Sequence, residues 1–160
     1  MYSTKTLMRL DDVAVFQIEN CVVSVWERTP TVEHIDKVDQ FLNEVTRDYP
    51  KGIGNINITM GRGQHAITAE TKAKIQKLIL KYQGKIIAVA HIILASGMIG
   101  AIISSFFALI AIIKNDANTP MRIFRESAEA AEWIAAKIGL DAQALEYELN
   151  TIICNFKMPE

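Results

Sequence analysis

One loop of the chain combines residue types that could hold an anion. Gly61, Gly63 and Ala66 fit the pattern Gly-x-Gly-x-x-Gly/Ala between a predicted strand and a predicted helix, and Arg62 and His65 lie among them. Backbone N–H groups at a helix start can bind phosphate, but the acidic residue that a dinucleotide site needs about 20 positions later is missing. An ordinary turn is the simpler interpretation. The functional alternative is an anion contact formed by Gly61, Arg62, Gly63 and His65.

The other side chains capable of catalysis or metal binding are scattered along the sequence. His34, His65 and His91 share no metal-ligand spacing, and Cys21 and Cys154 are far apart in the chain. We therefore predict no metal site, no catalytic residues and no cofactor. His91 is unusual because it lies in an apolar segment, where burial disfavours its charged form and calls for a hydrogen-bond partner. A structural core histidine is the simpler interpretation there.

The first part of the chain predicts a hairpin followed by a helix. Residues 13–18 and 21–26 are rich in β-branched and aromatic residues around a polar break, which is typical of an antiparallel pair. Thr29-Pro30 predicts a helix start, and the helix should end by Asp48-Tyr49-Pro50. Its apolar stripe has helical spacing and comprises Ile35, Val38, Phe41, Leu42 and Val45.

Strands and helices then alternate. Residues 55–60 alternate with period two, which puts Ile56, Ile58 and Met60 on one face of a strand. Thr68 predicts the cap of a second helix that Gly84 closes, and residues 86–94 predict a strand buried on both faces. The remaining predicted elements are a helix over 98–113, a strand over 121–124, a helix from a Ser127 cap to Gly139, and a last helix opened by Asp141.

This order predicts a mixed, mostly parallel α/β sheet of about five strands with the sequence β-β-α-β-α-β-α-β-α and an extra C-terminal helix. We expect one α/β domain over residues 1–138 and a helical extension over 139–160 packed on it. Seventeen Lys and Arg residues against 18 Asp and Glu residues give a net charge of −1. With this charge, no electrostatic field around the protein would attract nucleic acid. The N-terminal residues lack the apolar stretch of a secretion signal. We expect a cytoplasmic protein.

From Ile86 to Ile113 the chain contains no Asp, Glu, Lys or Arg. A continuous helix over this run would exceed the ~30 Å hydrocarbon thickness of a bilayer, so a membrane span is one interpretation. Glycines near the middle of the run, and the strand-helix rhythm, favour a buried strand followed by a helix. We adopt the second interpretation.

The predicted helix 98–113 is apolar all round, so one of its faces needs a second cover. We predict that it forms a symmetric homodimer interface. The alternatives are the C-terminal helix folded over it, a membrane surface, or a bound apolar ligand. The predicted interface residues are Ile99, Ile102, Ile103, Phe106, Phe107, Ile110 and Ile113.

The order of elements across residues 13–136 resembles the STAS domains, found in anti-sigma-factor antagonists (SpoIIAA-like proteins) and in sulphate transporters, and more loosely the lipid-binding SEC14-like relatives. The ending Arg122-Ile-Phe-Arg-Glu-Ser-Ala-Glu-Ala-Ala-Glu-Trp-Ile134 shares the family's short strand leading into an alanine-rich helix. In the antagonists a serine of an Asp-x-Ser-Gly motif is phosphorylated. The matching stretch here, residues 59–68, lacks that motif, although Thr68 lies near the equivalent place.

Three functions remain open. The first, which we favour, is a non-catalytic regulatory or scaffolding interaction module of bacterial type, a homodimer that also binds an unknown protein partner. The second is a membrane-associated or lipid- or apolar-ligand-binding protein. The third is an enzyme or binder that uses the loop at 61–65 on a phosphorylated small molecule.

Overall fold

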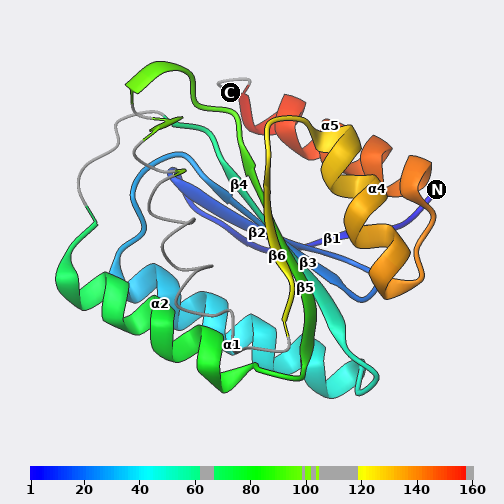
Figure 1. Ribbon diagram of the computed structural model, residues 1–160, viewed down its shortest axis with the longest axis horizontal. Helices are drawn as coiled ribbons and strands as arrows, with labels where there is room; N and C mark the ends of the chain where they lie inside the picture. The colour runs from blue at the N-terminus through cyan, green and yellow to red at the C-terminus, as the bar shows by residue number, and fades with distance from the viewer. Residues whose placement is uncertain (62–66, 99, 102–103, 105–118, 158–160) are drawn as a thin grey trace.

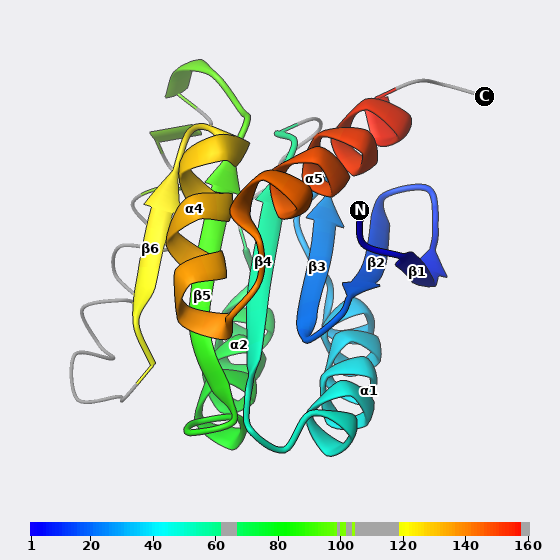
Figure 2. The same ribbon diagram turned by 90° about the vertical axis from the view of Figure 1, so that its right-hand side faces the viewer.

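The computed structural model describes residues 1–61, 67–98, 100–101, 104 and 119–157, and these form a layered α/β structure (Figure 1). The strands are β1 (Thr4–Arg9), β2 (Val13–Ile18), β3 (Cys21–Trp26), β4 (Ile53–Thr59), β5 (Ile86–Ile93) and β6 (Met121–Phe124). The helices with assigned bounds are α1 (Val32–Asp48), α2 (Ala69–Lys81), α4 (Ser127–Ile138) and α5 (Ala142–Lys157). Helices α1 and α2 lie against one face of the sheet, and α4 and α5 lie against the other (Figure 2).

Within the described residues the six strands lie in sequence order from β1 to β6. The pairs β1–β2 and β2–β3 are antiparallel, whereas β3–β4, β4–β5 and β5–β6 are parallel. The crossovers through α1 and α2 both step one strand in the same direction. Right-handed crossovers of that kind put both helices on the same face of the sheet, as observed. The predicted mixed, mostly parallel α/β class is confirmed.

Strand β1 was not predicted, so the sheet has one strand more than the sequence indicated. Its residues, Thr-Lys-Thr-Leu-Met-Arg, are polar or half-exposed along most of their length. They pair with β2 at the edge of the sheet, with an irregularity between Thr6 and Met8. Edge strands bury little surface and often carry charged residues, so the alternation that identifies a strand is weak here.

Two helix starts differ from prediction by one or two residues. Helix α1 is capped by Thr31 rather than Thr29, because the Thr31 hydroxyl accepts a hydrogen bond from His34 N and the His34 side chain accepts one from Thr31 N. Helix α4 begins after Glu126, and the Ser127 hydroxyl instead donates to Asn150 on α5. The Thr68 cap and the left-handed Gly139 at the end of α4 are confirmed.

Residues 86–93 form strand β5, so the uncharged run is not one continuous helix. After it, Met98, Gly100, Ala101 and Ser104 are helical. Among the described residues, no helix has both the length and the apolar character to cross a bilayer.

The face that α4 and α5 cover is an uninterrupted apolar core. Leu145 and Leu149 of α5 are fully buried against the sheet and α4, together with Ile134. Ile56, Ile58 and Met60 share this face, as the alternation in β4 predicted. The last helix is therefore part of the core layer, whereas the division into residues 1–138 and 139–160 stays a prediction.

Candidate functional site

A cavity of about 110 Å³ lies between the sheet and the α1–α2 layer. Its walls are mainly aliphatic side chains from both helices and from β5, with Trp26 of β3 and Met121 of β6. Half-buried Ile75, Leu78 and Ile79 of α2 form the side opposite the sheet. The aliphatic lining residues are Ile35, Val38, Leu42, Ile67, Ile75, Leu78, Ile79, Ile86 and Val89.

The sheet side of the cavity carries four polar side chains, which we call the polar floor: Asn55, Asn57, Thr59 and His91. Alternation along β4 puts its three members on the face opposite Ile56 and Ile58, and Asn57 pairs in register with His91 of β5. Asn57 also pairs with Ser24 of β3, which is fully buried beside it. A polar row therefore crosses the middle of the sheet under the two helices.

The two asparagines are linked in a short chain of hydrogen bonds. The Trp26 indole N–H donates to Asn57 Oδ1 over 3.4 Å, and Asn57 Nδ2 donates to Asn55 Oδ1 over 2.7 Å. Asn55 Nδ2 donates in turn to the Val22 carbonyl at the long distance of 3.5 Å. Each amide can form about four hydrogen bonds, so the chain orients both side chains and leaves each of them further capacity on the cavity side.

His91 is 4% exposed and neutral at pH 7. Burial lowers the pKa of its imidazole to about 3, because the surrounding groups cannot solvate the charged ring. A neutral imidazole has one N–H donor and one acceptor nitrogen. The polar floor therefore offers donors and acceptors without charge.

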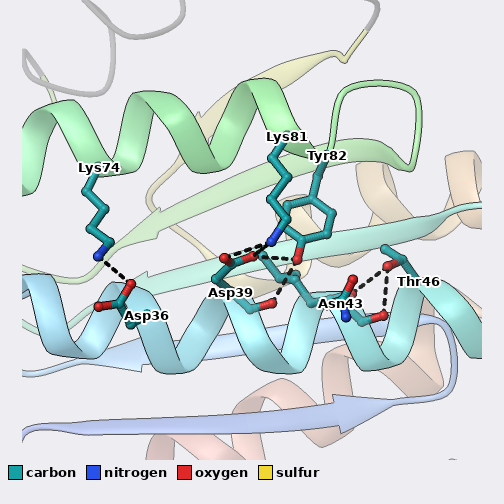
Figure 3. A network of polar contacts seen from close by, with 8 residues as sticks. Asp36, Asp39, Asn43, Thr46, Lys74, Lys81 and Tyr82 are labelled. Atoms are coloured by element: carbon teal, nitrogen blue, oxygen red, sulfur yellow. Dashed lines mark hydrogen bonds and ion pairs between the residues drawn. The ribbon is translucent and has the colours of Figure 1, made fainter.

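Helix α2 covers the cavity and is held at its outer edge by α1. Lys74 of α2 forms an ion pair with Asp36, and Lys81 forms one with Asp39 at 2.7 Å (Figure 3). The Tyr82 hydroxyl donates to Asp39 Oδ1 and to the Asp39 carbonyl. Thr71 is the buried residue of the helix, whereas the residues over the cavity are half-buried. Polar contacts with α1 thus supplement the packing of α2 on the sheet.

Tyr82 should be a principal attachment of this helix end. Burial and the hydrogen bond to Asp39 raise the pKa of the Tyr82 hydroxyl, so it remains a donor at neutral pH. Tyr82→Phe should lower the free energy of unfolding by about 1 kcal/mol, because the O–H that Asp39 Oδ1 and the Asp39 carbonyl share is lost while the buried ring stays. Urea unfolding would measure it, with the exposed Tyr147→Phe as the matched control. Equal stability of the two variants would show that the bond contributes nothing.

Of the four residues predicted to contact an anion, Gly61 is described, and Arg62, Gly63 and His65 lie outside the described residues. Gly61 follows β4 with φ +79°, and a Cβ atom there would overlap Ala95 after β5. The glycine is thus required both by its backbone conformation and by the close approach of two loops at the carboxyl edge of the sheet.

Gly61→Ala should therefore destabilise the protein more than Gly139→Ala does. Gly139 has a similar φ of +75°, but a Cβ atom at that position would meet no atom within 4 Å. Left-handed backbone alone costs about 1–2 kcal/mol for a residue with a Cβ, and the overlap with Ala95 adds to it. Thermal unfolding of both variants would check the order, and equal losses would contradict the tight loop packing.

The other predicted sites have different outcomes. Thr68 caps α2: its hydroxyl accepts from Thr71 N and donates to Thr71 Oγ1. Its role as a phosphorylation site stays a prediction. Cys21 is buried, and burial raises the pKa of its thiol to about 12. Within the part of the chain that the structure describes, no group of three or more His, Cys, Asp or Glu residues could hold a metal ion.

The seven predicted interface residues all lie outside the described residues. Met98, at the start of that segment, is 82% exposed. The homodimer interface therefore stays a prediction.

The polar floor was missed as a site, although the sequence contained a signal for it. The alternation that put Ile56 and Ile58 on one face of β4 also put Asn55 and Asn57 together on the other. Two asparagines on the inner face of a central strand are unusual, because buried polar groups need partners. His91 was also singled out from the sequence, but its position beside Asn57 depends on how β4 pairs with β5, which the sequence pattern alone does not give.

The comparisons with known proteins concern the fold. No family model matches the chain, and no curated protein matches it. Among solved structures, it is similar to an uncharacterized protein of the DUF3478 family with a SpoIIAA-like fold, from Shewanella loihica PV-4. The TM-score is 0.54 at 14% identity, over 82% of this chain and 91% of that chain. The chain therefore has a SpoIIAA-like fold, the STAS-like architecture that its order of elements predicted.

Proposed function

We propose that this chain is a non-catalytic regulatory or scaffolding module that acts by binding proteins, first of all a second copy of itself. The observation that supports this proposal is the SpoIIAA-like fold, together with the resemblance to the anti-sigma-factor antagonists. The proposal includes a cytoplasmic location and no nucleic-acid partner, in keeping with the net charge of −1. An unknown protein partner stays part of it.

Self-association is proposed from the sequence of residues 98–113. Ile99, Phe106 and Ile110 are three of the large apolar residues there, and burying each such side chain contributes about 1.5–3 kcal/mol. A few of them left in water would therefore favour association by several kcal/mol. A second copy is the proposed cover because a twofold axis lets one patch cover its own equivalent.

Light scattering coupled to gel filtration, without detergent, tests this proposal. The wild-type chain should have the mass of a dimer at micromolar concentration. Phe106→Asp should give a folded monomer, whereas Tyr147→Asp, at an exposed position on α5, should remain a dimer. A monomeric wild-type protein would overturn the homodimer.

A second candidate function is the binding of a small apolar ligand, and the cavity under α2 favours it. Ligand sites in proteins are mostly apolar concavities with a few convergent polar groups, which describes this cavity and its polar floor. Benzene added to the protein should shift the NMR signals of cavity residues. Benzene-induced shifts of equal size at exposed positions, or no shifts at all, would exclude ligand binding in the cavity.

A further inference from the structure

The two faces of the sheet differ in a way that packing alone does not require. Beneath α4 and α5, the inward side chains of β3, β4 and β5 are apolar throughout, among them Val23, Ile58 and Ile92. Beneath α1 and α2, the neighbouring positions hold Ser24, Asn57 and His91. Burying a polar group without full compensation costs about 1–3 kcal/mol in proteins, so valine or isoleucine would make a more stable core here.

Part of this cost is uncompensated in the structure. The Ser24 hydroxyl is fully buried and finds no hydrogen-bond partner among the described residues. The bonds from Trp26 to Asn57 and from Asn55 to Val22 are long, at 3.4 and 3.5 Å. A buried polar row with incomplete hydrogen bonds does not stabilise the fold, so recognition of a ligand explains its presence better than stability does.

The lining of the cavity selects against charge. The polar floor consists of two amides, a hydroxyl and an imidazole that is neutral at pH 7. Among the residues that the structure describes, no Asp, Glu or Lys lines the cavity, and Arg28, the one charged residue of that described lining, is exposed at the surface. A buried charge on a ligand would therefore have no buried counter-charge, and its desolvation would oppose binding.

The volume of the cavity limits the size of the ligand. An apolar cavity of about 150 Å³ in another protein accommodates benzene, and the cavity here is about 110 Å³. Its α2 side is lined by half-buried Leu78 and Ile79. A single ring or a branched chain of similar bulk fits with a small displacement of these side chains.

We propose that the cavity binds an uncharged, ring-sized organic molecule that turns one hydrogen-bonding group toward Asn57. This inference rests on the second proposed function and adds the chemical class of the ligand. It predicts that an aromatic alcohol binds more tightly than the corresponding hydrocarbon, and that the corresponding carboxylate binds least.

Phenol, benzene and benzoate are the probes, titrated into the protein at pH 7 and followed by NMR. Phenol should bind about tenfold more tightly than benzene, the effect of one hydrogen bond of about 1.4 kcal/mol. Benzoate should shift no cavity signal at the concentration at which phenol saturates. The thermal midpoint of each variant is measured first, so that a loss of binding can be attributed to the site and not to unfolding.

Two variants locate the site. Leu78→Phe fills the cavity from α2 and should weaken phenol and benzene alike by at least about tenfold. Leu80→Phe is its control on the same helix, because Leu80 is 62% exposed and does not line the cavity, and it should bind as the wild type does. Asn57→Leu should remove the preference for phenol, so that phenol binds no more tightly than benzene does.

The outcomes separate the two levels of the proposal. If benzene and phenol bind equally and Leu78→Phe abolishes both, the cavity binds apolar ligands but the polar floor does not select them, and the inference is wrong. Binding of benzoate as tight as that of phenol would also overturn it. If none of the probes shifts a cavity signal, the second proposed function fails together with the inference.

Discussion

Between pH 6 and pH 4 the wild-type protein should lose about 2–3 kcal/mol of unfolding free energy that His91→Gln retains. The pKa of His91 is lowered by burial to about 3 in the folded chain, against about 6.5 in the unfolded chain. The unfolded state therefore binds a proton in this range and the folded state does not. The contribution of neutral His91 to the free energy of unfolding is fully present above pH 6.5. It falls as the pH decreases toward 3, by about 1.4 kcal/mol per pH unit.

Urea unfolding of both proteins at pH 6, 5 and 4 measures this difference. Every other titratable group is common to both proteins, so the difference between the two pH profiles isolates His91. Gln keeps a hydrogen-bonding side chain at the position but cannot take up a proton in this range. Parallel pH profiles for the two proteins would mean that the folded state solvates the charged form of His91, contrary to the uncharged polar floor.

Leu149→Ala should lower the free energy of unfolding by about 3 kcal/mol. Leu149 is fully buried on the inner side of α5, in the core formed with α4 and the sheet. Removing a buried leucine side chain costs about 2–5 kcal/mol, because transfer free energy is lost and a cavity remains. Tyr147→Ala, on the exposed side of the same helix, should stay within about 0.5 kcal/mol of the wild type.

Chemical denaturation with a single probe on α5 and another on the sheet would check whether the helix unfolds with the rest. Two coincident transitions, both shifted by Leu149→Ala, are expected. A loss below about 1 kcal/mol, or a separate early transition of α5, would mean that the last helix is an appendage whose packing contributes little.

The sequence predicted the elements with strong periodicity and missed those that depend on tertiary context. Strand β6 was predicted with the bounds that the structure has, and β5 to within one residue, because turn residues border both of them. Strand β1 was missed because its extended conformation depends on pairing with β2 and not on a pattern in its own residues. The Thr68 cap could be predicted because it needs one side chain and the backbone three residues later.

The cavity itself could not be predicted in this way. It depends on how α2 sits on the sheet, and that follows from contacts between distant residues, such as Lys81 and Tyr82 with Asp39. Burial alone would raise the pKa of Asp39, but the hydrogen bonds from Lys81 and Tyr82 lower it, so the carboxylate stays charged and holds the helix. Periodicity identified the apolar side of α2 but not the distance of that side from β4 and β5.

The claim on which the account depends is that Asn55 and Asn57 face a small neutral cavity that admits a ligand. Phenol titrated into the isotope-labelled protein tests it most directly, through the side-chain amide signals of these two asparagines. We predict that both pairs of signals shift and saturate in the wild type, and that Leu78→Phe needs at least about tenfold more phenol for the same shift. Amide signals that do not move while phenol shifts resonances elsewhere on the surface would contradict the account.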